Sequence, residues 1–510
     1  MTLPDWLDPL PDAAEQRALD GWAIGELGIP GLELMERAGT GLAELVAERA
    51  PTGRIAVVCG KGNNGGDGLV AARVLRDRGR ETEVLILGAP DEYLGDARAN
   101  LERLPGPPPQ PFRAAALEGA AAIVDAILGT GFAGEPREPV AGAIDAIDEA
   151  RAGAVVVACD VPSGVDASTG VVAGRAVHAH ATATFHAAKP GLWIAPGKQH
   201  AGEVRVVDIG IPPGGPADPR IGLIAPAVLD GVPRRGAEST KFAAGSVLVC
   251  GGSPGLTGAP CMASESAMRA GAGYVTACVP ASLHAIFEGR LLEVMTVPLR
   301  DNEGALHPTA VGEAVERAAR VDAVVLGPGL GRDPGAVRFA RGLASALELP
   351  LILDADGLNA HAGELEALAD RQAPTVLTPH PGELGRLLEI ESQAVQARRL
   401  ECARRAAKQA RAIVVLKGDD TIIAQPDGRA AVSPGGAPAL ATAGTGDVLS
   451  GVIGAFLAKR MDPFHAACAG VFAHVRAGQL AGESIGPEGV IASDVIGAQP
   501  AALRARRAIP

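Results

Sequence analysis

The segment 443–447, AGTGD, combines bare backbone amides with one carboxylate. It precedes the apolar run VLSGVIGAFLA, so we expect it to form the start of a helix. Backbone amides at a helix start can stabilise a phosphoryl group, and Asp447 can take the proton from an attacking hydroxyl. The pattern therefore indicates phosphoryl transfer, although Asp447 taken alone could be only a cap that complements the helix dipole.

Four other segments of the second half place small or polar residues directly after apolar, strand-like runs. No G-x-x-x-x-G-K-[ST] sequence occurs, which excludes a P-loop nucleotidase and leaves other phosphoryl transfer open. Each segment lies at a predicted strand exit or helix start. The four are GGSPGLTGAP (251–260), GPGLG (327–331), TPHPGE (378–383) and KGDDT (417–421).

The first half contains a glycine loop, GKGNNGGDG at 60–68, between an apolar strand-like run and a helix-like segment. Such a loop exposes unpaired N–H groups and the positive end of a helix dipole, so it attracts an anion. Gly60, Gly62 and Gly65 satisfy G-x-G-x-x-G, but the acidic residue expected about 20 positions later is absent. A simple NAD dehydrogenase is therefore disfavoured, and the amide and carboxylate side chains of the loop need another role.

Two aspartates repeat this arrangement at predicted strand ends. Asp125 opens DAILGTGFAGE, and Asp160 opens DVPSGVDASTG. Either one alone could cap a turn, but together with Asn63, Asn64 and Asp67 they indicate one crevice. Carboxylate and amide oxygens without His or Cys suit a hard cation rather than zinc.

Several histidines could be metal ligands. In AVHAHATATFH, the spacing of His178 and His180 could place two of them on one face of a strand. Because no third ligand motif and no H-E-x-x-H sequence accompanies them, we interpret these two and His186 as polar strand residues. We interpret His361 as structural.

The elements that must position these residues follow from hydrophobic periodicity. Short β-branched runs alternate with alanine-rich helical stretches, which predicts parallel sheets wrapped by helices. Between Ile209 and Gly245 proline and glycine replace this periodicity. We therefore predict an α/β protein with domains at residues 1–215 and 222–505. A length of 510 residues agrees, since a single core stops growing near about 250 residues.

Composition restricts the partners and the location. The formal net charge is −13 and Lys and Arg form no cluster, so we expect no nucleic acid partner. No segment approaches 18 uninterrupted apolar residues and the N-terminus has no signal-peptide pattern, so we expect neither membrane insertion nor export. The seven cysteines form no C-x-x-C pair, which fits a reducing, cytoplasmic location.

Five segments of the first half resemble, in order, the N-terminal YjeF-type domain of NAD(P)H-hydrate epimerases, and the match spans nearly the whole half. These enzymes interconvert the R and S forms of hydrated NADH and NADPH. The resemblance implies a Rossmann-like three-layer αβα fold and a K⁺ site formed by Asn64, Asp125 and Ser163. The segments are ALDGWAIGELGIPGLELMERAG, CGKGNNGGDGLVAARVL, DAILGTG, DVPSGVDASTG and TATFHAAKPGL.

The resemblance also implies a site for the hydrated dinucleotide. Epimerisation at a carbon that bears oxygen and nitrogen needs proton transfer, for which Asp160 is the first candidate and Lys189 the second. The loop at 60–68 would then hold a dinucleotide and a metal together. The implied contacts are Asn63, Asn64, Gly65, Gly66 and Asp67, then Gly129, Thr130, Gly131, Phe132, Ala133, Gly134 and Glu135, and finally Asp160.

The second half resembles a different family. Its GTGD segment resembles the ribokinase-like superfamily, in which this aspartate is the base. The set GGSPGLTGA, GPGLG, DADGLN, TPHPGE, KGDDT and AGTGDVLSG resembles one branch, the ADP- or ATP-dependent NAD(P)H-hydrate dehydratases, over nearly the whole half. The family usually has S-H-K before its first strand, whereas residues 239–241 are STK, which leaves the role of Lys241 open.

This second resemblance implies two sets of contacts. His380 has an alternative role, since beside Pro381 it could simply initiate the following helix. The implied hydrate contacts are Ala259, Gly329, His380 and Asp447. The implied nucleotide contacts are Lys417, Gly418, Asp419, Asp420, Thr421 and Gly446.

Together the two resemblances predict a bifunctional repair enzyme that epimerises the hydrates, NADHX and NADPHX, and dehydrates the S form. Hydroxide is a poor leaving group, so Asp447 would direct phosphorylation of the 6-hydroxyl by ADP or ATP, with Mg²⁺ offsetting phosphate charge. The KGDDT branch suggests ADP, and the family implies a homo-oligomer. The alternatives are a ribokinase-like vitamin-precursor kinase and a dinucleotide-sensing module without turnover.

Overall fold

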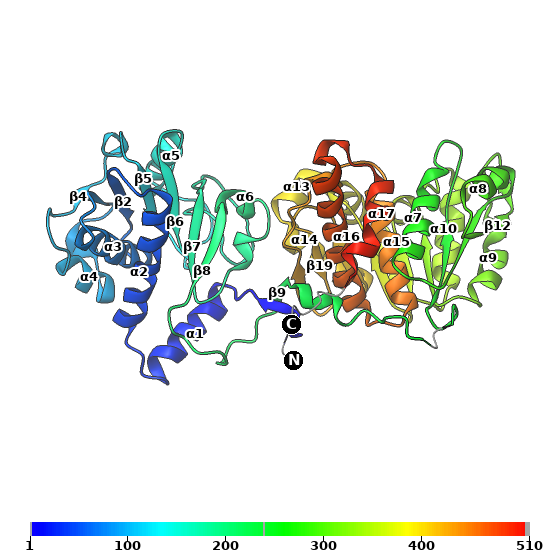
Figure 1. The fold of residues 1–510 in the computed structure, drawn as a ribbon, viewed down its shortest axis with the longest axis horizontal. Coiled ribbons are helices and arrows are strands. Elements are labelled where there is room, and N and C mark those ends of the chain that lie inside the picture. Colours follow the sequence, from blue (N-terminus) through cyan, green and yellow to red (C-terminus); the bar gives the residue numbers. More distant parts are fainter. Residues whose placement is uncertain (1–2, 238–239, 505–510) are drawn as a thin grey trace. The chain divides into compact units, whose positions relative to one another are not determined.

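The chain folds into two compact units, drawn in Figure 1. The computed structural model describes residues 3–237 and 240–504. The first unit is built from Pro9–Gly222, and the second from Pro4–Asp8 and from Leu223 onward. The short strand β1 (Leu7–Pro9) is a neighbour of β9 (Ile221–Ile224) at the edge of the second unit's sheet, a pairing that no pattern in the sequence indicated.

The first unit contains a seven-stranded sheet in which every pair of neighbouring strands is parallel. Its central strands are buried along their whole length, and apolar except at Asp125, because helices cover both faces. The strand order is β4 (Gln110–Pro111), β3 (Thr82–Ile86), β2 (Ile55–Cys59), β5 (Ala122–Ala126), β6 (Val155–Cys159), β7 (Ala181–Phe185) and β8 (Glu203–Val207).

Two hydrophobic clusters, one on each face, make this unit a three-layer structure. One cluster joins the sheet to the second and third helices, and the other joins it to the fifth. The helices are α1 (Ala13–Gly25), α2 (Gly31–Arg49), α3 (Asn63–Asp77), α4 (Gly95–Glu102), α5 (Val140–Ala150) and α6 (Gly197–Ala201).

Strand order reverses next to β2, which has β3 on one side and β5 on the other. The loops that leave β2 and β5 therefore diverge and open a crevice at the carboxyl ends of these strands. The glycine loop at 60–68 follows β2, and the loop containing Gly129 follows β5.

The second unit contains an eleven-stranded sheet. Its pairs from β18 to β12 are parallel, and β18, β19 and β20 pair antiparallel. The order is β1, β9, β20 (Ala430–Val432), β19 (Ile422–Ala424), β18 (Ile413–Leu416), β17 (Thr375–Leu377), β16 (Leu351–Leu353), β15 (Ala323–Leu326), β10 (Ser246–Cys250), β11 (Tyr274–Pro280) and β12 (Met295–Leu299). A separate hairpin joins β13 (Asp301–Asn302) to β14 (Ala305–Leu306).

Helices cover the second sheet, and the order again reverses at one strand, β10, which lies between β15 and β11. The α/β prediction is therefore confirmed for both halves, each of which contains a layered, mostly parallel sheet. The helices are α7 (Gly258–Arg269), α8 (His284–Arg290), α9 (Val311–Ala318), α10 (Pro334–Ala346), α11 (Asp356–Asn359), α12 (Pro381–Leu388), α13 (Ser392–Ala397), α14 (Arg399–Ala410), α15 (Thr445–Ala458), α16 (Pro463–Ile485) and α17 (Ala492–Ala502).

Two further predictions concern cysteines and membranes. All seven cysteines are buried free thiols, as expected for small core residues. Within residues 3–237 and 240–504, no helix combines the length and the apolar run that a bilayer crossing requires.

Candidate active sites

A pocket of about 640 Å³ lies at the carboxyl ends of β2 and β5 in the first unit. Residues from four separate segments meet there because parallel strands end at the same edge of a sheet. Lys189, the second candidate for proton transfer, lines the pocket as well. The predicted hydrate contacts in its wall are Asn63, Asn64, Asp67, Gly129, Thr130, Gly131, Phe132 and Asp160.

The other predicted hydrate contacts lie outside the pocket wall. Gly65 and Gly66 are buried in the first turn of α3, and an added Cβ on Gly65 would come within 1.7 Å of the carbonyl oxygen of Gly60. These two glycines therefore permit close packing of the loop. Ala133, Gly134 and Glu135 are exposed, farther along the loop that leaves β5.

An ion pair between Asp160 and Lys189 lies in this pocket. Lys189 Nζ donates to Asp160 Oδ1 at 2.7 Å, to Thr184 Oγ1 at 2.9 Å and to the Phe185 carbonyl at 2.9 Å. The Lys189 side chain is only 1% exposed. Asp160 adopts a φ of 65°, a left-handed conformation that is strained for most residues, at the end of β6. The neighbouring elements therefore hold this carboxylate in a fixed place.

Two more carboxyls from different helices line the same pocket. Burial raises the pKa of Asp67 well above its ordinary value, and the charges of Asp160 and Asp20 raise it further. Burial also raises the pKa of Asp20, a residue of α1. Lys189 thus interacts with Asp160, Asp67 and Asp20, and burial makes the last two easier to protonate than an exposed aspartate.

The predicted K⁺ ligands form a buried cluster linked by the Leu128 peptide. Asp125 Oδ1 and Oδ2 accept from Ser163 Oγ at 2.6 Å and from Ser163 N at 2.8 Å. Asn64 Nδ2 donates to the Leu128 carbonyl at 2.9 Å, and Leu128 N donates to Ser163 Oγ at 2.9 Å. Burial raises the pKa of Asp125 to about 6, which the Ser163 hydrogen bonds oppose.

This cluster fits a hard monovalent cation. Asp125 is fully buried, and none of the ion pairs among the described residues reaches its carboxylate. A bound cation would supply the missing charge, and carboxylate, hydroxyl and carbonyl oxygens are its preferred ligand types.

The histidines of the first unit have other partners. His178 Nδ1 lies 2.7 Å from Asp148 Oδ2, and its ring stacks on His200. His180 Nδ1 accepts from the Val156 amide at 2.9 Å. Within the described part of the chain, no group of three or more His, Cys, Asp or Glu side chains could hold a metal ion.

A second pocket, of about 290 Å³, lies in the second unit beside the start of α15. Its wall also contains apolar residues of α16 and the turn at 437–441, together with His474. An added Cβ on Gly446 would lie 3.3 Å from Lys417 Nζ. The backbone at the start of α15 and the Lys417 ammonium group are therefore close together in the pocket wall. The predicted nucleotide contacts in this wall are Lys417, Gly418, Asp419, Thr421 and Gly446.

Asp420 was also predicted as a nucleotide contact, but it does not line this pocket. Its Oδ2 accepts from Arg399 Nε at 2.8 Å, and both side chains are 5% exposed. The two adjacent aspartates of KGDDT lie in a turn and have different partners, since Asp419 Oδ1 accepts from the Gly436 amide at 2.7 Å whereas Asp420 pairs with Arg399.

Asp447 lies in the first turn of α15 within a cluster of charged side chains. Lys417 Nζ donates to Asp354 Oδ1 at 3.0 Å and lies 3.7 Å from Glu383 Oε2. Burial raises the pKa of Asp447 to about 7, Asp354 adds to the rise, and Lys417 opposes it. Asp447 can therefore be ionised or protonated near neutral pH, as a proton acceptor requires.

The predicted hydrate contacts of the second unit lie on one loop and at the starts of three helices. Gly329 has a φ of 61°, and its added Cβ would lie 3.2 Å from that of Ala259, so these two residues are adjacent. His380 caps α12, since its Nδ1 accepts from the Gly382 amide at 3.0 Å. Its side chain remains 51% exposed, so the helix-initiating role and a ligand contact are compatible.

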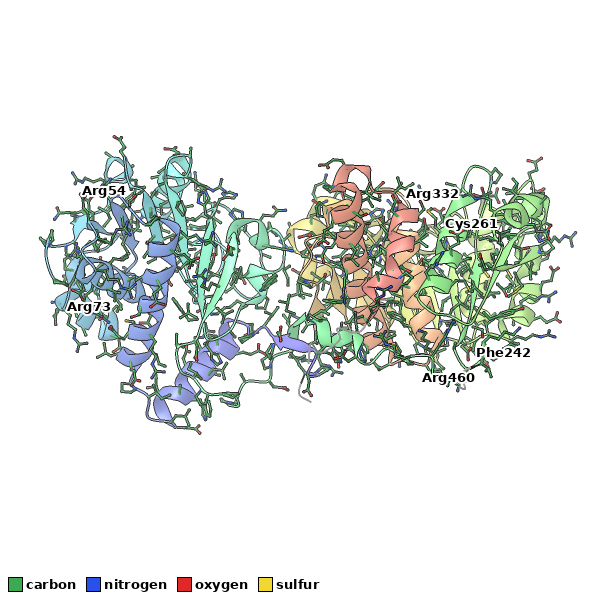
Figure 2. All side chains as sticks on the ribbon, viewed as in Figure 1. Arg54, Arg73, Phe242, Cys261, Arg332 and Arg460 are labelled. Carbon is green, nitrogen blue, oxygen red and sulfur yellow. The ribbon has the colours of Figure 1, made fainter. Side chains whose placement is uncertain are left out.

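Lys241 is exposed and lies over the aromatic rings of Phe242 and Tyr274, 5.2 and 5.6 Å from their centroids. Phe242 is labelled in Figure 2. Ser239 lies outside the described residues. The structure therefore gives Lys241 a cation–π contact.

Several residues of these sites were missed from the sequence. Asp354 and Glu383 follow strand ends within the motifs DADGLN and TPHPGE, but their contacts with Lys417 depend on tertiary packing. Gln16 and Asp20 of α1 line the first pocket. No motif contains Gln16, and Asp20 lies in the segment ALDGWAIGELGIPGLELMERAG but was not predicted as a site residue, because their helix reaches the pocket from outside the sheet's strand ends.

Two family models match the chain. The model described as YjeF-related protein N-terminus matches residues 31–191, and the model described as NAD(P)H-hydrate dehydratase matches residues 247–500. The first matched segment includes the Asp160 pocket except for Ile209 and the residues of α1, and the second includes Asp447 and the pocket beside it.

Curated relatives match over nearly the full length. The bifunctional NAD(P)H-hydrate repair enzyme of Moorella thermoacetica is 41% identical over 510 residues, which cover 96% of this chain and 96% of the relative. That of Salinibacter ruber is 39% identical, with 96% and 95% covered. A solved ADP/ATP-dependent NAD(P)H-hydrate dehydratase from Bacillus subtilis, co-crystallised with ATP and Mg²⁺, is 30% identical, with a TM-score of 0.46, and the match covers 54% of this chain and 94% of that one.

Proposed function

Because this chain belongs to the family of bifunctional NAD(P)H-hydrate repair enzymes, we propose that its two pockets divide the repair of hydrated NADH and NADPH between them. The first unit epimerises the R and S hydrates, and the second dehydrates the S form at the expense of a nucleotide. The observation that carries this proposal is the presence of a separate proton-transfer site in each unit, Asp160 beside Lys189 and Asp447 beside Lys417.

Epimerisation requires two proton transfers. The hydrate carries a hydroxyl and a ring nitrogen on the same carbon, C6, so removal of the hydroxyl proton with protonation of the nitrogen breaks the C6–N1 bond and gives an aldehyde. Rotation and reclosure on the other face produce the opposite epimer. We assign Asp160, held by Lys189, as the base, and Asp67, whose pKa is raised by burial, as the acid.

A K⁺ ion held by Asn64, Asp125 and Ser163 would stabilise the loops after β5 and β6 that line this pocket. Its contribution is charge compensation for the buried Asp125 carboxylate. The observation that supports the ion is the lack of a described cationic side chain at that carboxylate. Hydrate contacts at Asn63, Thr130 and Phe132 follow from their place in the pocket wall.

Dehydration in the second unit begins with Asp447. Ionised Asp447 takes the proton of the 6-hydroxyl, whose oxygen attacks the terminal phosphorus of ADP; the bond from this phosphorus to the bridging oxygen breaks, and AMP leaves. The amides at 444–446 and Lys417 stabilise the phosphoryl oxygens in transfer. The ring nitrogen then expels phosphate from C6, and loss of a C5 proton restores the dihydronicotinamide.

The co-substrate is ADP, with ATP as the alternative, in the pocket beside α15. Mg²⁺ would enter with the phosphates and offset their charge, since this ion keeps several waters and binds few protein carboxylates. Lys417, Gly418, Asp419, Thr421 and Gly446 line that pocket, whereas Asp420 supports the loop through Arg399. Ala259, Gly329 and His380 are the proposed hydrate contacts.

The cellular setting is also part of the proposal. The substrates are small molecules of central metabolism, so we place the enzyme in the cytoplasm, in agreement with the buried free thiols. We expect it to act as a homo-oligomer.

A direct assay tests the two activities together. Hydrated NADH containing both epimers is mixed with the enzyme, Mg²⁺ and ADP, and recovery of the near-UV dihydronicotinamide absorbance is followed. Recovery of both epimers supports the proposal. Recovery of the S form alone would show an inert first unit, and a stable phosphorylated product from a vitamin precursor would favour the kinase alternative.

A further inference from the structure

Helix α1 contributes a residue with an unsatisfied acceptor to the wall of the first pocket. Gln16 lines the pocket and is only 4% exposed. Its Nε2 donates to Asp20 Oδ1 at 2.9 Å, one turn later on the same helix. Its Oε1 is buried without a hydrogen-bond partner among the described residues.

The orientation of this amide follows from its neighbour. Because Nε2 of Gln16 donates to Asp20, Oε1 of the same amide points away from that carboxyl and has no partner among the described residues. Buried polar atoms are rarely left unpaired in folded proteins, which indicates that a ligand completes this one. The ligand must supply an N–H or O–H group at this position.

The position of Gln16 relative to the catalytic groups narrows the choice of donor. Asp20 interacts electrostatically with Lys189 and Asp160, so Gln16 lies at the end of the pocket where proton transfer takes place. The charged groups there are suited to the 6-hydroxyl and the ring nitrogen. The other donor that the hydrated ring carries is the N–H₂ of its carboxamide.

We propose that Gln16 Oε1 accepts a hydrogen bond from the carboxamide N–H of the hydrated dinucleotide and thereby positions C6 against Asp160. This inference rests on the proposed epimerase function and extends it to a helix outside the matched segment 31–191. Asp12, which caps α1 through the Ala14 and Glu15 amides, fixes the start of that helix.

The test compares two substrates with two enzymes. The substrates are hydrated NADH and the hydrate of its 3-acetylpyridine analogue, in which an acetyl group without N–H replaces the carboxamide. The full-length wild type and Gln16→Ala are assayed for epimerisation of each, with Gln110→Ala, an exposed glutamine on β4, as the matched control.

Loss of a neutral hydrogen bond costs roughly tenfold in kcat/KM, so Gln16→Ala should lose about tenfold with hydrated NADH. With the acetyl analogue, wild type and Gln16→Ala should differ by less than about twofold, because the partner group is already missing. Circular dichroism and the rate of S-hydrate dehydration by the same chain verify folding.

Equal losses with both substrates would overturn the inference, since they would indicate a structural role for Gln16. Unchanged rates with hydrated NADH would overturn it too. A wild type that epimerises neither hydrate would instead refute the proposed function itself.

Discussion

Lys189 and Asp160 form a buried ion pair in which the ammonium nitrogen lies 2.7 Å from the carboxylate oxygen and the lysine side chain is 1% exposed. Two segments far apart along the chain, the end of β6 and the turn after β7, supply these groups. The pair fixes the carboxylate that we assign as the epimerase base.

Replacement of Lys189 by Met should impair both stability and epimerisation. Removing one partner of a buried ion pair leaves an unpaired buried charge, which costs about 3–5 kcal/mol of unfolding free energy. Loss of the positioned base should also lower the epimerisation rate by roughly 10²–10⁴-fold. Urea unfolding and the epimerisation rate measure the two effects. Lys408→Met, at an exposed position of α14, should change neither, and an unimpaired Lys189→Met enzyme would contradict the assignment.

K⁺ should stabilise the first unit. A ligand that binds only the folded state stabilises it by RT ln(1 + [L]/Kd), or about 2.7 kcal/mol at a hundredfold excess over Kd. Thermal unfolding in KCl should therefore begin at a higher temperature than in a tetramethylammonium salt of equal ionic strength. Asp125→Asn should remove this difference. A difference that persists in Asp125→Asn would place the ion elsewhere.

Asp420 and Thr421 should respond differently to mutation. Because Asp420 pairs with Arg399 and both side chains are 5% exposed, Asp420→Asn should lower the unfolding free energy by about 3 kcal/mol and change nucleotide affinity little. Thr421→Ala should weaken nucleotide binding with a smaller loss of stability. Urea unfolding and calorimetric titration with ADP separate these outcomes, and the reverse pattern would place Asp420 in the nucleotide site.

The pH dependence of dehydration should reflect Asp447. Burial, followed by the charge of Asp354, raises its pKa to about 7, and only the ionised form can take a proton. The dehydratase kcat/KM should therefore rise with pH through about 7 and reach a plateau above it, with roughly a tenth of the plateau value at pH 6. A profile that is flat from pH 6 to pH 8 would contradict this role.

The raised pKa of Asp447 also predicts how the free energy of unfolding changes with pH. The folded-state pKa of Asp447 lies above the unfolded value, so its stabilising contribution is present below pH 4 and is lost as the pH rises through about 7. At pH 8 Asp447→Asn should therefore be more stable than the wild type, by on the order of 1–2 kcal/mol in urea unfolding.

Motifs at strand ends were the part of both sites that the sequence could predict. The glycine loop and Asp160 lie where they were expected because parallel strands bring their carboxyl ends to one edge, and GTGD lies at the start of α15, as its sequence predicted. The α/β class followed from the alternation of β-branched and alanine-rich runs.

Other features depended on contacts that no local pattern records. The pairing of β1 with the second sheet joins residues more than 200 positions apart. The approach of Gln16 to the first pocket depends on how α1 packs, and the separation of Asp419 from Asp420 depends on the buried Arg399. Charge pairs such as Lys417 with Asp354 are likewise set by tertiary structure.

The most direct test of two cooperating sites is the final recovery of dihydronicotinamide absorbance from a mixture of R and S hydrates with ADP and Mg²⁺. The wild type should recover both epimers. Asp160→Asn should recover the S epimer at the enzymatic rate and leave the R epimer behind, and folded Asp447→Asn should recover neither. Full-rate recovery by Asp447→Asn would contradict the account.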